Sequence, residues 1–318
     1  MKPILADLII SRIQKKYFKG IPANSFEKVA KEVNMLLENG VRYRNEIRYS
    51  DQYANSFFDI YYGSEEITLP RPTIVLLHGG GFFMGSRISG DPLANIQIAA
   101  GMPNGYLAKA GFNIVVPDYC LAPKYRYPDQ LFQVNELFTF LLAHGAEYHL
   151  DTQNIVLMGG SAGAVFTAQY GVILSNPDYA ARMGITPAIG MDRLKGVIID
   201  GAPMNPARMN WATATMFRTW LNISNLKTSR QAQEIHAALW VNGSYPPAFL
   251  TAGNDGCYAE DARELHAALI KNGVDSTLFI VDIKDQKEPH GYLNKFQTDP
   301  FAKEGLDRLL AFAKRRTS

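Results

Sequence analysis

The apolar residues of this chain form two repeating patterns, short unbroken runs and longer stretches with helical spacing. The unbroken runs are rich in β-branched residues, which is typical of strands buried on both faces of a sheet. They cover residues 73–77, 113–117, 155–158, 196–200, 248–252 and 277–282. Helical spacing follows at 129–146, from 162 to about 174, from 256 to about 272 and at 301–315. Because strands and helices alternate, the sequence predicts an α/β fold with a mostly parallel sheet flanked by helices.

The remaining segments lie outside this alternation. Residues 1–45 are predicted to be helical, with a break at residues 20–22 and a stop at Asn39-Gly40, and to form an N-terminal cap segment. Residues 41–62 alternate aromatic and β-branched positions and predict one or two edge strands. We therefore predict a catalytic domain over 46–318, in which residues 203–245 form a second cap segment.

The segment 203–245 is crowded with large apolar side chains: Met204, Met209, Trp211, Met216, Phe217 and Trp220. Methionine and aromatic stripes are most often ordinary helical core. A second interpretation is that the inner face of this segment lines an acyl pocket, and the two interpretations are compatible.

Composition and charge exclude several classes of function. The chain has 318 residues, 47% of them hydrophobic, and a formal net charge of +2 with acids and bases scattered along it. No basic stripe indicates nucleic acid, and no apolar run approaches the roughly 20 residues needed to span a bilayer. Asp7 and Arg12 interrupt the N-terminal apolar run, against a signal peptide. We expect a cytoplasmic protein with Cys120 and Cys257 reduced, although one bridge stays open, as does a homodimer.

The run at 155–158 leads into Gly159-Gly160-Ser161-Ala162-Gly163 and then an Ala-rich helical segment. A serine between strand and helix sits in a strained turn that exposes its hydroxyl at the sheet edge, with the positive end of the helix dipole directed at it. We predict that Ser161 is a nucleophile. The alternative is a chance match in a glycine-rich loop.

A second motif, His78-Gly79-Gly80-Gly81-Phe82, directly follows the strand at 73–77. Consecutive glycines let a backbone approach a ligand closely, and here they predict amide N–H groups directed at a developing oxyanion. The alternative is a plain connecting loop, but His-Gly-Gly-Gly arises by chance much less often than the serine motif.

Two further residues complete a catalytic set. Asp255 follows the strand at 248–252, and His290 follows the strand at 277–282. The order Ser161, Asp255, His290 is the nucleophile, acid and base order of α/β-hydrolases. The alternatives are a turn aspartate and a surface histidine. Asp282 and Asp285 lie nearer to His290 in sequence, but one ends a strand and the other falls in a charged loop.

These motifs together resemble the hormone-sensitive-lipase-like family of α/β-hydrolase esterases. They comprise His78–Gly81, Asp118-Tyr119, Ala122-Pro123, Pro128, Gly159–Gly163, Asp255 and His290-Gly291. The resemblance implies an eight-stranded sheet with a helical cap, oxyanion N–H groups from Gly80, Gly81 and Ala162, and His78 as a brace for the loop. Phe82 beside it is taken as a binding residue. Cys120 and Lys124 replace the arginine and glutamate usual in the family, which puts a structural ion pair in doubt, and Asp255 lacks the usual Pro-Leu after it.

The function expected from this set is hydrolysis of small, uncharged acyl esters by a serine carboxylesterase. An aryl formamidase or other amidase-type hydrolase is the first alternative, and a ligand-binding module on the same fold is the second. The sequence holds no Walker loop, dinucleotide fingerprint or metal-ligand cluster, so we expect no cofactor and no metal.

Overall fold

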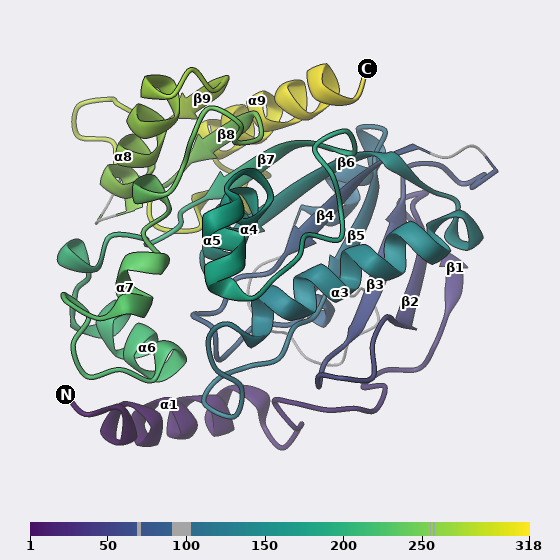
Figure 1. Ribbon diagram of the computed structural model, residues 1–318. Helices are drawn as coiled ribbons and strands as arrows, with labels where there is room; N and C mark the ends of the chain where they lie inside the picture. The colour runs from purple at the N-terminus through teal and green to yellow at the C-terminus, as the bar shows by residue number, and fades with distance from the viewer. Residues whose placement is uncertain (69–70, 91–102, 255, 257) are drawn as a thin grey trace.

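One sheet of nine strands, in the order β1-β2-β3-β5-β4-β6-β7-β8-β9, organises the molecule (Figure 1). The computed structural model describes residues 1–68, 71–90, 103–254, 256 and 258–318. The strands are β1 Asn34–Leu36, β2 Arg42–Arg48, β3 Phe57–Tyr62, β4 Arg71–Leu77, β5 Asn113–Pro117, β6 Leu150–Gly160, β7 Leu194–Asp200, β8 Ala248–Thr251 and β9 Ser276–Phe279. The pairs from β1 to β5 are antiparallel, and β5, β4 and β6 to β9 run parallel. The predicted α/β fold with a mostly parallel sheet is confirmed.

The prediction that the segment from residue 19 to 45 is helical is wrong. Part of this segment forms β1, so the sheet has nine strands instead of the predicted eight. Only Pro3–Phe18 is helical, as α1, and β1 pairs with β2 through a hairpin. Asn39-Gly40 forms the hairpin turn, with Gly40 at a φ of 79° and Leu37 N donating to Val41 O. Asn-Gly is a strong hairpin signal, and it does not end a helix here.

Helices cover both faces of the sheet. One face carries α3 (Asp129–His144), α4 (Ala162–Ser175), α5 (Pro177–Met183) and α8 (Tyr258–Lys271), and the other carries α2 (Asn104–Lys109) and α9 (Pro300–Thr317). Side chains of a strand alternate between the two faces. In β4, Val75 and Leu77 join the core under α3 and α4, whereas Ile74 and Leu76 join the core under α9. This double burial explains the unbroken apolar runs of the sequence.

The remaining helices gather beyond one end of the sheet. There α1 packs against α6 (Trp211–Leu221), with α7 (Arg230–Glu234) beside them (Figure 1). Arg126 fixes this arrangement, since its guanidinium binds both carboxylate oxygens of Asp7 in α1 and also donates to Thr219 O in α6. Short 3₁₀ turns lie at Arg87–Gly90, Gly145–Tyr148, Pro206–Arg208, Ala237–Leu239 and Tyr292–Lys295. The division of the chain into cap and catalytic segments stays a prediction.

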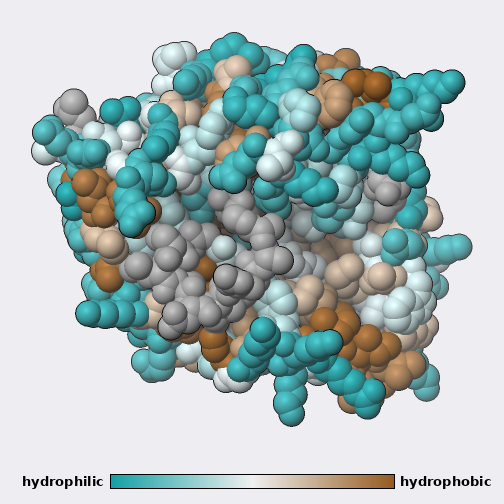
Figure 2. All heavy atoms as spheres, turned by 180° about the vertical axis from the view of Figure 1, so that it is seen from behind, coloured by the Kyte–Doolittle hydropathy of each residue, from teal (hydrophilic) through white to brown (hydrophobic). Residues whose placement is uncertain are grey.

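The surface seen from behind is mostly polar (Figure 2). Apolar side chains gather at its lower edge, over the part of the molecule formed by α1 and α6. Within the described residues, every helix is too short or too polar to cross a lipid bilayer.

Candidate active site

Ser161 occupies a strained turn at the carboxyl end of β6, directly before α4. Its φ of 55° and ψ of −114° lie outside the regions that most side chains adopt, and its N–H donates to Asp200 O at 2.8 Å. A Cβ atom on Gly163 would come within 2.2 Å of Leu77 O. The backbone of α4 therefore approaches β4 so closely that only glycine fits at position 163.

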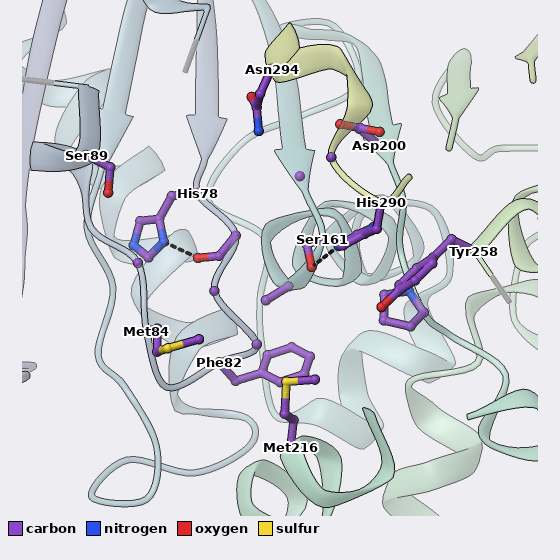
Figure 3. Close-up of a pocket in the computed structure, with 18 of the residues that line it drawn as sticks. His78, Phe82, Met84, Ser89, Ser161, Asp200, Met216, Tyr258, His290 and Asn294 are labelled. Atoms are coloured by element: carbon purple, nitrogen blue, oxygen red, sulfur yellow. Dashed lines mark hydrogen bonds between the residues drawn. The ribbon is translucent and has the colours of Figure 1, made fainter. Parts of the chain in front are cut away.

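His290 lies next to this serine (Figure 3). Its Nε2 and Ser161 Oγ are 2.8 Å apart, which is hydrogen-bonding distance. The imidazole stacks on the Tyr258 ring, with centroids 3.9 Å apart, and a side chain at Gly201 would collide with its Nδ1 edge. Partial desolvation by the surrounding pocket lowers the pKa of His290 to about 4, although the residue keeps contact with solvent. The ring is thus neutral near pH 7, the state in which a nitrogen can accept a proton.

The predicted acid, Asp255, lies outside the described residues, as does Cys257. The residue before it, Asn254, connects the end of β8 to the loop that carries His290. The Asn254 amide donates to Val281 O and Gln286 O, and its carbonyl accepts from Glu288 N. The sequence analysis missed this brace, because its partners lie 27 to 34 residues away.

The glycine loop after β4 faces the same site. Gly80 and Gly81 have φ values of 118° and 61°, and a Cβ on Gly80 would come within 2.1 Å of Met84 O. Phe82 also has a positive φ, of 72°, and its ring stacks on Trp220 at 3.9 Å between centroids. Ala162 begins α4, so its backbone lies at the positive end of that helix.

His78 lies behind the glycine loop and holds it from one side. Its Nδ1 is 2.7 Å from Gly79 O, and its ring stacks on Tyr119. The Tyr119 hydroxyl in turn donates to His78 O at 2.6 Å. These contacts suit a residue that braces the loop.

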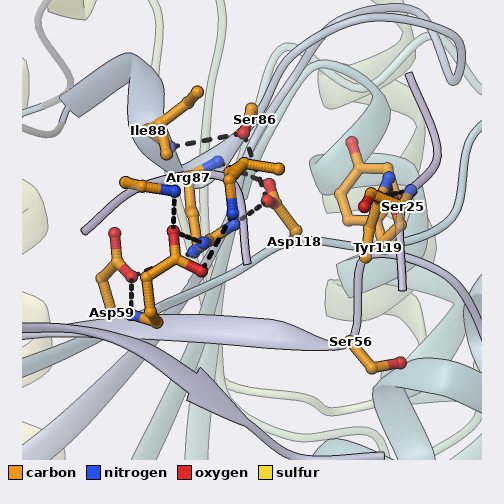
Figure 4. A network of polar contacts seen from close by, with 12 residues as sticks. Ser25, Ser56, Asp59, Ser86, Arg87, Ile88, Asp118 and Tyr119 are labelled. Carbon is orange, nitrogen blue, oxygen red and sulfur yellow. Dashed lines mark hydrogen bonds and ion pairs between the residues drawn. The ribbon is translucent and has the colours of Figure 1, made fainter. Parts of the chain in front are cut away.

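A buried arginine anchors the chain that follows the loop (Figure 4). Arg87 donates from Nε to Asp59 Oδ1 at 2.9 Å, and its other nitrogens pair with Glu46 and Asp118. Burial raises the pKa of Asp59 and Glu46 despite the arginine. Burial works against the charge on Asp118 too, but Arg87 and His78 outweigh it and lower its pKa.

The sequence analysis missed Arg87, and the ion pair it doubted was a different one, between positions 120 and 124. The arginine expected after Asp118-Tyr119 is replaced by Cys120, which is buried as a free thiol. Arg87 forms a network of its own with Glu46, Asp59 and Asp118. Its partners lie about 30 residues or more away, so no local pattern marks it.

A pocket of about 420 Å³ joins these parts. Ser161 and His290 line it, with Met216 of α6 further along its wall (Figure 3). Further lining residues come from α1 and α6: Tyr17, Thr213 and Phe217. Segment 203–245 supplies both core and pocket-lining side chains, and that the pocket takes an acyl group stays a prediction. Met216 and Phe217 line the pocket, Met204 and Trp220 are core, and Trp211 is exposed.

Asp200 is a carboxylate that lines the pocket, and it had no predicted role. It ends β7, next to the strand that carries Ser161, and burial raises its pKa to about 7. Its Oδ1 has no hydrogen-bond partner among the residues described. Its place at a strand end beside the serine strand is a sequence signal that could have singled it out.

Comparison with known proteins places the chain among esterases. The BD-FAE family model matches residues 58–268. An esterase of Gibberella moniliformis is 22% identical over 253 residues, 77% of this chain and 74% of that protein. The acetyl esterase of Salmonella paratyphi B is 31% identical over 101 residues, 30% of this chain and 28% of that protein.

Solved structures share the fold at low identity. Esterase B from Lactobacillus rhamnosis superposes with a TM-score of 0.73 at 17% identity, over 99% of this chain and 94% of that one. Esterase LipW from Mycobacterium marinum gives 0.64 at 17%, over 98% and 90%. The family match covers more than half of the chain, and the resemblance seen in the motifs is confirmed. The chain belongs to the BD-FAE family of α/β-hydrolase esterases and is a carboxylic ester hydrolase.

Proposed function

We propose that this protein is a serine carboxylesterase for short-chain acyl esters, with Ser161, His290 and Asp255 as its triad. The observation that carries the proposal is the 2.8 Å contact between Ser161 Oγ and His290 Nε2 at the apex of a strained turn. A nucleophile within hydrogen-bonding distance of a neutral imidazole is the arrangement that acyl transfer requires.

In the proposed reaction, His290 Nε2 takes the proton of the Ser161 hydroxyl as Oγ attacks the ester carbonyl. The N–H groups of Gly80, Gly81 and Ala162 hold the resulting oxyanion. The alcohol leaves with the proton from His290, and water then attacks the acyl-enzyme by the same route. Asp255 accepts from Nδ1–H, which fixes the tautomer and stabilises the imidazolium that forms.

Two observations support the proposal that the acyl group is short. The cavity of about 420 Å³ must hold both acyl and alcohol groups, and Met216 and Phe217 close it on the α6 side. The name of the Salmonella relative, an acetyl esterase, supports a short acyl group. We therefore expect the enzyme to prefer acetate to butyrate esters over longer ones.

The test is a p-nitrophenyl ester series from acetate to decanoate, run on wild type and Ser161→Ala. We expect kcat/KM to fall steeply beyond butyrate or hexanoate. Loss of the serine should lower kcat by about 10⁶-fold, since loss of a triad nucleophile has an effect of this size. Thermal unfolding should show that the variant stays folded.

An alanine variant that keeps near-full activity would contradict the proposed nucleophile. Inactivity of folded wild type on all esters, with turnover of an aryl formamide, would favour the amidase alternative instead. Failure of a fluorophosphonate to label Ser161 would favour a binding module.

A further inference from the structure

The outer face of α1 exposes large apolar side chains. Ile4 is 70% exposed, Leu8 58% and Leu5 51%. They lie in the first two turns of the helix, on the side opposite the buried Ala6 and Ile10. An apolar cluster left in water in this way commonly marks an interaction surface.

The same face continues as a row of cations. Arg12, Lys15, Lys16 and Lys19 follow Leu8 at helical spacing and are exposed, and Lys2 is exposed at the start of the helix. None of these five forms an ion pair with any residue the structure describes. The only acid of the helix, Asp7, is paired with Arg126. With a net charge of only +2 on the whole chain, this is a marked local excess of positive charge.

The inner face of α1 is fixed to the catalytic region. The Gln14 amide donates to Phe83 O at 2.7 Å and to Ala122 O at 3.0 Å, and Tyr17 lines the pocket. The outer face thus belongs to a firmly docked helix. Because Tyr17 of the same helix lines the pocket, anything that binds the outer face of α1 would lie close to the candidate active site.

We propose that the outer face of α1, formed by Ile4, Leu5, Leu8, Arg12, Lys15, Lys16 and Lys19, binds the surface of a bilayer that contains anionic phospholipid. Apolar side chains can enter the headgroup boundary while neighbouring lysines meet anionic headgroups. A second copy of the chain fits less well. Two such faces would set cations against cations or against apolar side chains, with no acid to neutralise them. This inference does not depend on the proposed catalytic roles.

The test measures how the full chain partitions onto sedimented vesicles at 0.1 M salt. Vesicles of phosphatidylcholine with 30% phosphatidylserine are compared with pure phosphatidylcholine. Each basic side chain near an anionic surface strengthens binding about fivefold, so we expect at least a tenfold preference for the anionic vesicles. The preference should weaken in 0.5 M salt.

Variants separate the two parts of the surface. Leu8→Asp should weaken binding to anionic vesicles at least tenfold, because a charge replaces an exposed leucine that enters the headgroup boundary in the proposed complex. The combined change Lys15→Glu and Lys16→Glu should remove most of the preference for anionic lipid. Ile270→Asp is the matched control, since Ile270 is 53% exposed on α8, far from α1 in Figure 1, and should bind as wild type.

Equal partition of wild type onto both kinds of vesicle would overturn the proposal, as would undiminished binding by Leu8→Asp. A dimer in sedimentation velocity that Leu8→Asp abolishes, without vesicle binding, would make a second copy the occupant and equally overturn it. Circular dichroism and activity on p-nitrophenyl acetate show whether each variant is folded.

Discussion

The two walls of the candidate active-site pocket are built in different ways. The wall that carries Ser161 and the glycine loop is made of backbone segments in very close contact. A Cβ on Gly163 would meet Leu77 O, and one on Gly80 would meet Met84 O. The wall formed by α1 and α6 instead presents side chains, such as Tyr17 and Met216, to the cavity.

We therefore expect the first wall to hold the reacting groups and the second wall to determine which substrates fit. Backbone geometry cannot be adjusted one atom at a time, so the parts that must meet a transition state are held by strain and by buried charges. Side chains can be exchanged without moving the backbone, so the α1 and α6 wall can change its substrate range while the reaction stays the same. Four experiments, each built on one substitution and most with a matched control, test this view. They are given from the largest expected effect to the smallest.

The first compares Asp255, the acid predicted from the sequence, with Asp200, which ends β7. Asp255→Asn should lower kcat/KM by about 10⁴-fold, because the imidazole would lose the partner that fixes its tautomer. Asp200→Asn should lower it less than tenfold. The pH profile gives a second readout. A carboxylate beside His290 raises the pKa of the imidazole, so without it the acid limb of kcat/KM should move to lower pH. Reversal of the two effects would make Asp200 the acid of the triad.

The second experiment removes the buried guanidinium of Arg87, which lies in the chain after the glycine loop. Arg87→Met should lower the free energy of unfolding by about 3–5 kcal/mol at pH 7, because Asp59, Glu46 and Asp118 stay buried without their partner. Without the arginine the raised pKa values of Asp59 and Glu46 rise further, and the pKa of Asp118 rises as well. The folded state then binds more protons, and stability falls as pH rises.

Urea unfolding at pH 5 and pH 8 measures this effect. The deficit of the Arg87 variant relative to wild type should be larger at pH 8. A deficit independent of pH would mean that packing, and not charge, dominates at this position.

The strained turn at Ser161 and the main sheet could be predicted from sequence because both depend on local patterns. A β-branched run followed by Gly-x-Ser-x-Gly and a helical stretch specifies strand, turn and helix with no distant partner. The parts that were missed depend on distant contacts. In the segment predicted to be helical, Ala30 N donates to Glu46 Oε1 and Val33 N to Asn45 Oδ1. These partners lie on β2 and hold the segment extended, so helical spacing alone misled the prediction.

The third substitution tests the close backbone contact of the first wall. Gly163→Ala should destabilise the protein by about 1–3 kcal/mol or more, because the added Cβ would lie 2.2 Å from Leu77 O and the backbone must shift. Gly160→Ala is the matched control. A Cβ there meets no atom within 4 Å, so the unfolding free energy should be nearly unchanged. Equal effects at both positions in urea unfolding would contradict the contact.

The last and smallest effect is expected on the side-chain wall. Met216 lies against the glycine loop, so that a Cβ added at Gly81 would be 2.4 Å from its Sδ. Met216→Ala should widen the pocket and raise the ratio of hexanoate to acetate kcat/KM about tenfold, since a methylene in an apolar pocket changes selectivity by roughly 10- to 200-fold. Met209→Ala is the control, because Met209 belongs to the same segment but does not line the pocket. If both variants lose acetate activity equally, the wall positions the reacting groups and does not merely limit their size. A change confined to Met216, with acetate turnover kept, would show that substrate length is set by a replaceable side chain.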